Sequence, residues 1–139
     1  MELGESFSSI LQLIFNKIPK EFVCEDRGIT ITRTSVPKSS LKCTKGVTVF
    51  RASPKETLAA ISNIDYYKKF DPKILESKTV STIDPHTTLN YFEFAPFFPM
   101  SGRDFSFVQH VQLQPDNSII VSWHSVKDNS IPKKKGLVR

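Results

Sequence analysis

Residues 94–105 read FAPFFPMSGRDF, and they predict a corner between two strands. Pro96 and Pro99 each lack a backbone N–H donor, so this stretch cannot form the middle of a helix or of a central strand. One strand therefore ends near Phe94, the chain turns through an apolar elbow, and a second strand begins at Arg103-Asp104. So many apolar side chains need a cover, which is the protein's own core, a lipid or a membrane.

The strand that leaves this corner belongs to a hairpin whose register can be predicted. Residues 103–114 and 118–126 flank the three-residue loop 115–117, and pairing Gln114 with Ser118 sets the register. The positions that then share an apolar face are Phe105, Phe107, Gln109, Val111, Leu113, Ile119, Val121 and Trp123. The positions that share the opposite, polar face are Ser106, His110, Gln112, Ser122 and His124. A slip of one residue would exchange the two faces.

Gln109 is the polar exception on the apolar face, and it lies directly across from Trp123 in this register. A buried amide without a partner costs about 1–3 kcal/mol. We therefore expect Gln109 to bind another side chain, a water or the polar head of a ligand.

The remaining sequence predicts further helices and strands. Ser53-Pro54-Lys55-Glu56 is a capping box that starts a helix through Ile61, and a second short helix spans 65–71. Strands are expected from Gly28, over 41–49, over 74–84 and over 87–95. Apolar residues between Leu3 and Ile18 recur at helical spacing, which predicts an amphipathic helix that packs on the domain or lies on a membrane.

Composition indicates one globular domain of 139 residues with a net charge of +5, which favours acidic partners. No apolar run approaches the length of a transmembrane helix, about 20 residues. Cys24 and Cys43 fit no metal-ligand spacing and suit a reducing compartment, so we expect a cytoplasmic protein, peripheral at membranes. The histidines also lack such a spacing, and we expect no metal, no cofactor and no catalytic residue.

Three motifs in this order resemble the START (StAR-related lipid-transfer) domain family. They are SPKETLAAISNIDYYKKFDP, PMSGRDF after Tyr91-Phe92-Glu93-Phe94, and SVKDNSIPKKKGLVR, and the resemblance covers residues 28–139. It implies an α+β helix-grip fold, in which a curved antiparallel sheet accompanies an N-terminal helix and two short helices. It also implies a single lipid-binding domain over 1–139 that is truncated, because the family's C-terminal closing helix is missing from this chain.

The resemblance implies binding and intermembrane transfer of a single sterol, phospholipid or sphingolipid in a hydrophobic cavity. The expected ligand-binding residues are Tyr67, Phe92, Phe94, Phe105, Phe107, Gln109, Val111, Val121 and Trp123. Phosphatidylcholine-binding relatives carry an arginine where this chain has Tyr67, and sterol-binding relatives carry a buried basic residue where it has Gln109. Because of these two departures, the resemblance does not identify the class of lipid that this chain binds. Arg103 and Asp104 match the family and are expected to be structural, as an ion pair or as caps.

Lysines 133–135 form a basic loop that we expect to contact anionic membranes. Two other functions stay open from the sequence: a helix-grip enzyme acting on a hydrophobic substrate, and a basic nucleic-acid-binding module. The basic clusters match no nucleic-acid motif, so nucleic acid is not expected as a partner. Without a closing helix the apolar sheet face lacks a cover, so we expect either that this chain is a fragment of a longer protein or that the face self-associates.

Overall fold

The computed structural model describes residues 21–35, 40 and 42–139. These residues belong to two compact units, which divide between Arg51 and Ala52. The described strands form two antiparallel sheets, one in each unit, where the sequence led us to expect one curved sheet. The helix predicted between Leu3 and Ile18 lies outside the described residues.

The N-terminal unit contains a three-stranded sheet in the order β1-β2-β3. Its strands are β1 (Glu21–Asp26), β2 (Ile29–Ser35) and β3 (Lys42–Val47). The strands expected from Gly28 and over 41–49 are confirmed as β2 and β3, whereas β1 was not predicted. Arg27 and Gly28, which join β1 to β2, have φ angles of 47° and 75°. Positive φ at both positions is what a tight two-residue hairpin turn requires.

The C-terminal unit begins with helix α2 (Pro54–Ser62), and the predicted capping box starts it. Ser53 Oγ accepts a hydrogen bond from the backbone N–H of Glu56 at 3.2 Å, and the Glu56 carboxylate accepts one from the backbone N–H of Ser53 at 2.8 Å. The Ser53 hydroxyl also donates to this carboxylate at 2.7 Å, and the two hydrogen bonds that Ser53 donates, the hydroxyl's first, lower the pKa of Glu56. The single-turn helix η1 (Ile64–Tyr66) and helix α3 (Tyr67–Phe70) follow, and the chain leaves α3 just before Pro72.

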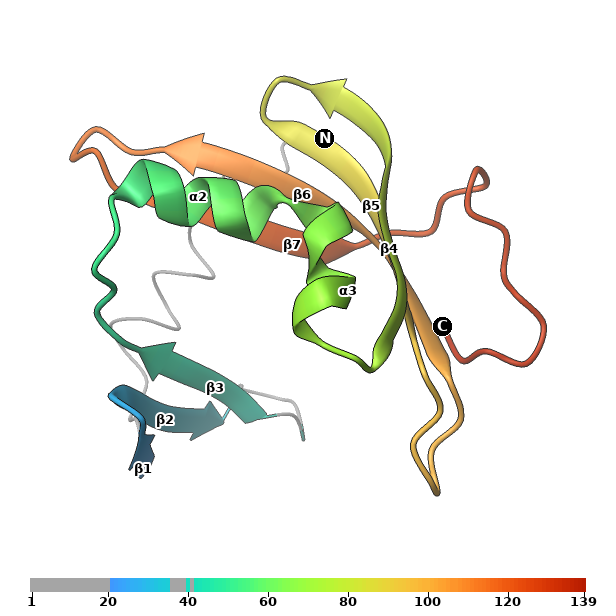
Figure 1. Cartoon of the computed structure of the whole chain (residues 1–139), viewed down its shortest axis with the longest axis horizontal. Coiled ribbons are helices and arrows are strands. Elements are labelled where there is room, and N and C mark those ends of the chain that lie inside the picture. Colours follow the sequence, from blue (N-terminus) through green and yellow to red (C-terminus); the bar gives the residue numbers. More distant parts are fainter. Residues whose placement is uncertain (1–20, 36–39, 41) are drawn as a thin grey trace. The chain divides into compact units, whose positions relative to one another are not determined.

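The second sheet is an antiparallel meander in the order β4-β5-β6-β7. Its strands are β4 (Ile74–Asp84), β5 (Thr87–Phe94), β6 (Arg103–Leu113) and β7 (Ile119–Ser125). Figure 1 shows α2 lying along β7 and α3 lying beside β4, on one face of this sheet. The predicted register is confirmed, because Gln109 pairs with Trp123 and Gln114 N–H donates to Ser118 O at 2.8 Å.

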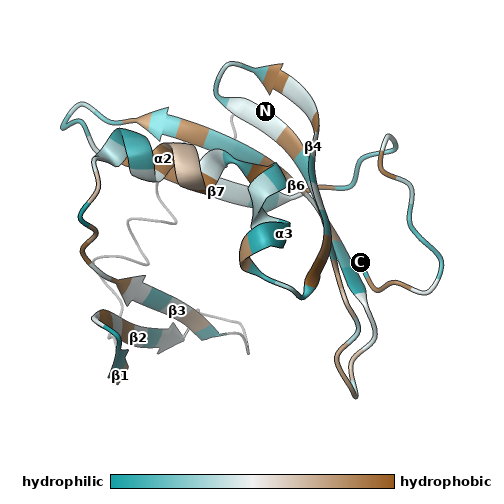
Figure 2. Ribbon diagram, viewed as in Figure 1, coloured by the Kyte–Doolittle hydropathy of each residue, from teal (hydrophilic) through white to brown (hydrophobic). Residues whose placement is uncertain are grey.

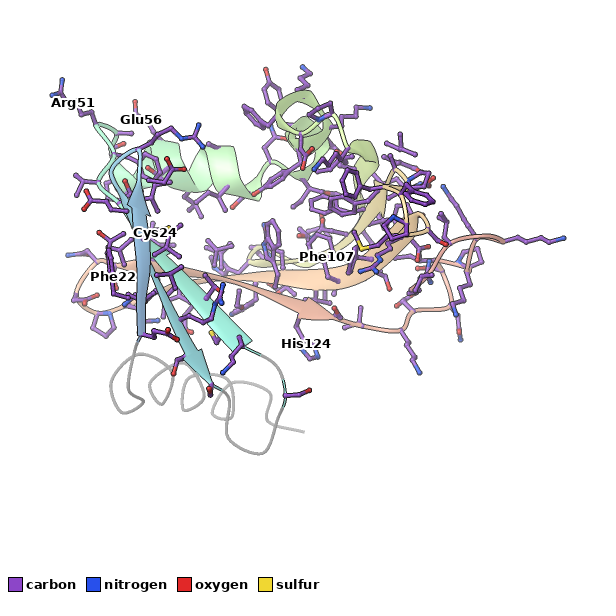
Figure 3. The ribbon with its side chains drawn as sticks, turned by 90° about the horizontal axis from the view of Figure 1, so that it is seen from below. Phe22, Cys24, Arg51, Glu56, Phe107 and His124 are labelled. Atoms are coloured by element: carbon purple, nitrogen blue, oxygen red, sulfur yellow. The ribbon has the colours of Figure 1, made fainter. Side chains whose placement is uncertain are left out.

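Two small cores lie on opposite faces of this sheet. On the helix-covered face, Ile64 of η1 packs with Phe92 and Phe107. On the other face, Leu89 and Tyr91 pack with Ile131, together with the partly buried Val80, Val108 and Val126. The face predicted to be polar is therefore partly apolar, because residues after Val126 return and place Ile131 against it. His124 and Phe107 project to opposite sides of the sheet, as Figure 3 shows.

The corner at residues 94–105 is a hairpin that projects beyond the sheet (Figure 1). β5 ends at Phe94 and β6 begins at Arg103, as predicted, and both prolines lie outside the strands. Phe97 and Met100 pair across the tip through two backbone hydrogen bonds of 2.6 and 3.0 Å. Gly102 serves close packing here, since a Cβ at this position would lie 2.9 Å from Leu137 Cδ2.

Candidate functional site

The helix-covered face of the second sheet gathers the aromatic residues that the sequence predicted as ligand-binding. Strand alternation places Phe92 and Phe94 of β5 on this face, and the observed pairing brings Phe105 and Phe107 of β6 beside them. The predicted set is therefore brought to one face. Tyr67 joins it from α3. Val111 and Val121, also predicted, pair with each other farther along the same face and are half-buried.

The rings on this face touch in an unbroken series. Phe92 lies at its centre, with the rings of Tyr67, Phe94, Phe107 and Trp123 at centroid distances of 5.3, 6.1, 5.0 and 5.9 Å. Phe105 extends the series, because its ring centroid lies 5.6 Å from that of Phe94. Such tilted and edge-on pairs contribute about 0.5–1.5 kcal/mol each beyond their buried area. We call these six residues the aromatic face.

Exposure rises along the aromatic face toward the hairpin. Phe92 and Phe107 are buried, Phe94 is half-buried, and Phe105 is 42% exposed. Trp123, at the β7 side, is 40% exposed. The face thus has a buried centre and two partly open ends.

Gln109 has a protein partner, which is the first of the three alternatives that the sequence left open. Its side chain is buried, and its Oε1 accepts a hydrogen bond from the indole Nε1 of Trp123 at 2.8 Å. This bond orients the indole ring, whose centroid lies 5.1 Å from that of the Phe107 ring with the two planes tilted by 37°. Gln109 therefore helps to shape the aromatic face.

Tyr67 carries another neutral polar group at this face. Its hydroxyl donates to the backbone carbonyl of Ile61 at 3.0 Å, which ties α3 to the end of α2. Burial raises the pKa of the Tyr67 phenol, so the group is un-ionised at neutral pH. The polar groups that Tyr67 and Gln109 bring to the aromatic face are therefore uncharged.

Asn90 is a residue of this face that the sequence reasoning missed. It lies two residues before Phe92 on β5, pairs with Phe107 of β6, and is 0% exposed. Its Nδ2 donates to the carbonyl and the hydroxyl of Thr88, at 3.2 and 2.9 Å. Among the described residues, Asn90 Oδ1 has no hydrogen-bond partner. The available signal was the two-residue spacing from Phe92, which puts Asn90 on the same side of the strand.

The hairpin tip presents apolar side chains to solvent. Phe98 is 94% exposed, and Phe97 and Met100 on either side of the turn are also exposed. Figure 2 shows the hydrophobic colour at this tip. The Lys73 ammonium lies 5.3 Å from the centre of the Phe97 ring, and Arg103 Nη2 lies 3.5 Å from Met100 Sδ. The tip is thus an apolar protrusion with cations at its sides.

The opposite face of the sheet holds a charged network. Lys134, predicted to contact membranes, forms ion pairs with Glu76 at 2.9 Å and Glu93 at 2.5 Å, and these raise the pKa of its ammonium. Its Nζ also lies 5.2 Å from the Tyr91 ring centre, and burial raises the pKa of Tyr91 to about 12. The Lys134 ammonium therefore binds carboxylates of the sheet, although its side chain is 48% exposed, and Lys133 and Lys135 are exposed as well.

Asp104 is the buried acid of this network, and its partner differs from the one that the sequence suggested. Arg139 Nη2 binds Asp104 Oδ2 at 2.6 Å, and Arg139 Nε binds Asp104 Oδ1 at 3.0 Å. Arg103, the sequence neighbour, is exposed and forms no ion pair with Asp104. Strand alternation explains this, because Arg103 and Asp104 point to opposite faces.

Neither a metal-binding cluster nor a membrane-spanning helix is found among the described residues. Among residues 21–35, 40 and 42–139, no cluster of three or more His, Cys, Asp or Glu side chains has the arrangement of a metal site. Within the same ranges, no helix combines the length and the apolar character that crossing a bilayer requires.

The fold and the aromatic face together define an α+β domain of the helix-grip class. The chain belongs to the START domain family, because the model of that family matches residues 30–139. A comparison with curated proteins found no match.

Solved structures agree with this fold. Human StAR-related lipid transfer protein 5 is similar with a TM-score of 0.81 at 16% identity, over 96% of this chain and 65% of that one. Human STARD10 gives a TM-score of 0.81 at 21% identity, over 98% of this chain and 56% of that one. A STAR-related lipid transfer protein from Xanthomonas axonopodis gives 0.78 at 20% identity, over 86% of this chain and 67% of that one. This chain therefore spans between 56 and 67% of the length of these structures.

Proposed function

We propose that this chain binds a single lipid on the aromatic face and exchanges it with membranes. The observation that carries the proposal is the unbroken series of aromatic rings, buried at its centre and open at Phe105 and Trp123. Apolar surface of this kind is stabilised by covering it, at about 25 cal/mol per Å². The names of the solved structures with this fold, which are lipid transfer proteins, support a lipid as the cover.

Trp123 provides a direct test of lipid binding. It is the single tryptophan of the chain, it contacts Phe92 and Phe107, and it is partly exposed. A lipid on the aromatic face therefore comes close to the indole. The protein would be incubated with vesicles of phosphatidylcholine brominated on its acyl chains, and the vesicles would then be removed by flotation.

We expect Trp123 fluorescence to stay quenched after the vesicles are removed, relative to the same treatment with unbrominated lipid. Extraction of the protein should recover about one lipid per chain by mass spectrometry. Unquenched fluorescence, together with no co-purified lipid of any class, would contradict the proposal.

The hairpin tip is the part of the molecule that we propose to meet the membrane. Phe97, Phe98 and Met100 are exposed, and Phe94 and Phe105 at the base of the same hairpin belong to the aromatic face. Lys73 and Arg103 beside the tip match the phosphates of anionic headgroups. An inserted tip would thus bring the open end of the aromatic face to the bilayer.

Vesicle flotation separates this surface from the basic loop that the sequence suggested. Phe97→Ser with Phe98→Ser removes the apolar tip, and Lys133→Ser with Lys135→Ser removes the two lysines that flank Lys134 in the loop. We expect the first pair to abolish binding to vesicles of phosphatidylcholine and phosphatidylserine. The second pair should weaken it by about 1 kcal/mol per lysine and reduce its salt dependence. Unchanged binding of the Phe97/Phe98 variant would show that the tip does not insert.

Self-association is the proposed state of the aromatic face when no lipid covers it. Phe105 and Trp123 are partly exposed, and a second copy of the chain would bury them. Sedimentation of delipidated chain should give a dimer or larger species that lipid converts to monomer. A monomer in both conditions, with no binding of a hydrophobic dye, would contradict this.

A further inference from the structure

We propose that Asn90 is the polar anchor of the lipid site and that it accepts a hydrogen bond from an uncharged lipid head with a hydroxyl or amide donor. This inference rests on the proposed function. It concerns which lipid the aromatic face takes. Sterols, ceramides and diacylglycerols belong to this chemical class.

The unmet group of Asn90 is an acceptor, and its identity follows from its neighbours. One amide atom lies 3.2 Å from the backbone carbonyl oxygen of Thr88. A carbonyl oxygen only accepts, so the atom facing it is the Nδ2 donor and the atom left over is Oδ1. Asn90 is 0% exposed, and Oδ1 has no partner among the described residues. A buried carbonyl without a donor is costly, so the site favours a ligand that brings one.

The position of Asn90 directs this oxygen to the aromatic face. On β5 it stands between Thr88 and Phe92, which share its side of the strand, and on β6 it pairs with Phe107. Thr88 in turn pairs with Gln109, whose oxygen is already occupied by Trp123. Asn90 therefore offers a free acceptor next to the rings that would cover the lipid body.

The charge of the site selects against phosphate-bearing heads. Around Asn90 the strand positions on this side carry no ionisable side chain at 88 and 92, at 105, 107, 109 and 111, or at 121 and 123. Arg103 shares this side, but it pairs with Phe94 at the hairpin end of the aromatic face. A phosphate placed beside Asn90, away from Arg103, would lose its hydration without gaining a cation, which is unfavourable in an apolar site. A neutral head with one donor loses little water and gains the bond to Asn90 Oδ1.

Chemically blocked lipids test this inference in the unaltered chain. Cholesterol, 1,2-dioleoylglycerol and N-oleoylsphingosine would each be compared with a methyl ether or fully O- and N-methylated analogue that lacks the donor. Affinity would be measured by competition for the Trp123 quenching of brominated lipid. We expect at least one parent lipid to bind about fivefold more tightly than its blocked analogue, the factor typical of one neutral hydrogen bond.

Variants then assign the effect to Asn90. Asn90→Leu, which is similar in size and has no acceptor, should bind parent and blocked analogue equally while its free energy of unfolding stays close to that of the parent chain. Gln112→Leu removes an exposed amide from the other side of β6 and should preserve the fivefold preference.

The outcomes separate the two proposals. Binding of lipids without any preference for the free donor would overturn the role of Asn90 and leave lipid binding in place, since a water could then satisfy Oδ1. A preference that survives Asn90→Leu would also overturn it. No binding of any lipid would overturn the proposed function itself. If Asn90→Leu does not fold, the comparison of parent and blocked lipids on the unaltered chain still decides whether the site prefers a lipid with a free donor.

Discussion

Replacing Arg139 with Gln is expected to lower the free energy of unfolding by about 3–5 kcal/mol, because it leaves the Asp104 carboxylate buried without a cation. Asp104 is fully buried, and Arg139 Nη2 and Nε lie 2.6 and 3.0 Å from its two oxygens. With about 4 Å between charge centres and an effective dielectric constant of about 20, the attraction that is lost is about 4 kcal/mol.

A double variant distinguishes the cost of a buried unpaired charge from the cost of altered packing at the same position. Asp104→Asn together with Arg139→Gln removes both charges, so no uncompensated charge stays buried, and we expect it to cost less than Arg139→Gln alone. Arg103→Gln is the matched control, because Arg103 is exposed and should change stability by less than about 0.5 kcal/mol. Urea unfolding followed by circular dichroism would give all three values.

The pH dependence supplies an independent check of the same reasoning. Arg139 lowers the pKa of Asp104 in the folded chain, so this pair contributes stability above the unfolded pKa of about 3.9. That contribution is lost as the pH falls through the lowered folded pKa. In Arg139→Gln, burial instead raises the pKa of Asp104. The stability deficit of this variant should therefore be largest at neutral pH and shrink as the pH falls, first through the raised pKa of the variant and then through the lowered pKa of the parent chain. A deficit that stays constant from pH 7 to pH 3, or a double variant as unstable as the single one, would refute the argument.

Three further changes test the second sheet and the cap of helix α2 by urea unfolding. Gly102→Ala should cost about 1–3 kcal/mol, because the new Cβ would lie 2.9 Å from Leu137 Cδ2; an unchanged midpoint would mean that Leu137 moves away freely. Phe107→Ala should cost about 3–5 kcal/mol, since the ring is 5% exposed, and a loss below 1 kcal/mol would contradict its place in the core. Ser53→Ala should cost about 1 kcal/mol through loss of the cap to Glu56, and a simultaneous change in lipid preference would argue against a purely local role.

The sequence alone determined the elements whose causes are local. The capping box at Ser53 and Glu56 starts α2 because the interacting groups lie three residues apart. The register of β6 and β7 follows from a short loop and the alternation of apolar residues, and it correctly placed Gln109 opposite Trp123. The corner between β5 and β6 followed from its two prolines.

Strand β1 marks where local patterns were too weak. Its residues Phe22 and Val23 are adjacent and both exposed, so no alternation signals a strand. The strand forms because its backbone pairs with β2, and such pairing depends on the partner strand and on the turn at Arg27-Gly28.

Only the tertiary structure decided which side chains meet across long separations. Lys134 binds Glu76 and Glu93, and Asp104 binds Arg139 instead of its neighbour Arg103. The Oδ1 of Asn90 lacks a hydrogen-bond partner because Nδ2 is the amide atom that faces Thr88, and the sequence does not reveal this contact. Periodicity fixes the side of a strand on which a residue lies. It does not tell which distant segment covers that side. The segment after β7 packs back on the sheet, and this tertiary packing brings Lys134 to Glu76 and Glu93, and Arg139 to Asp104.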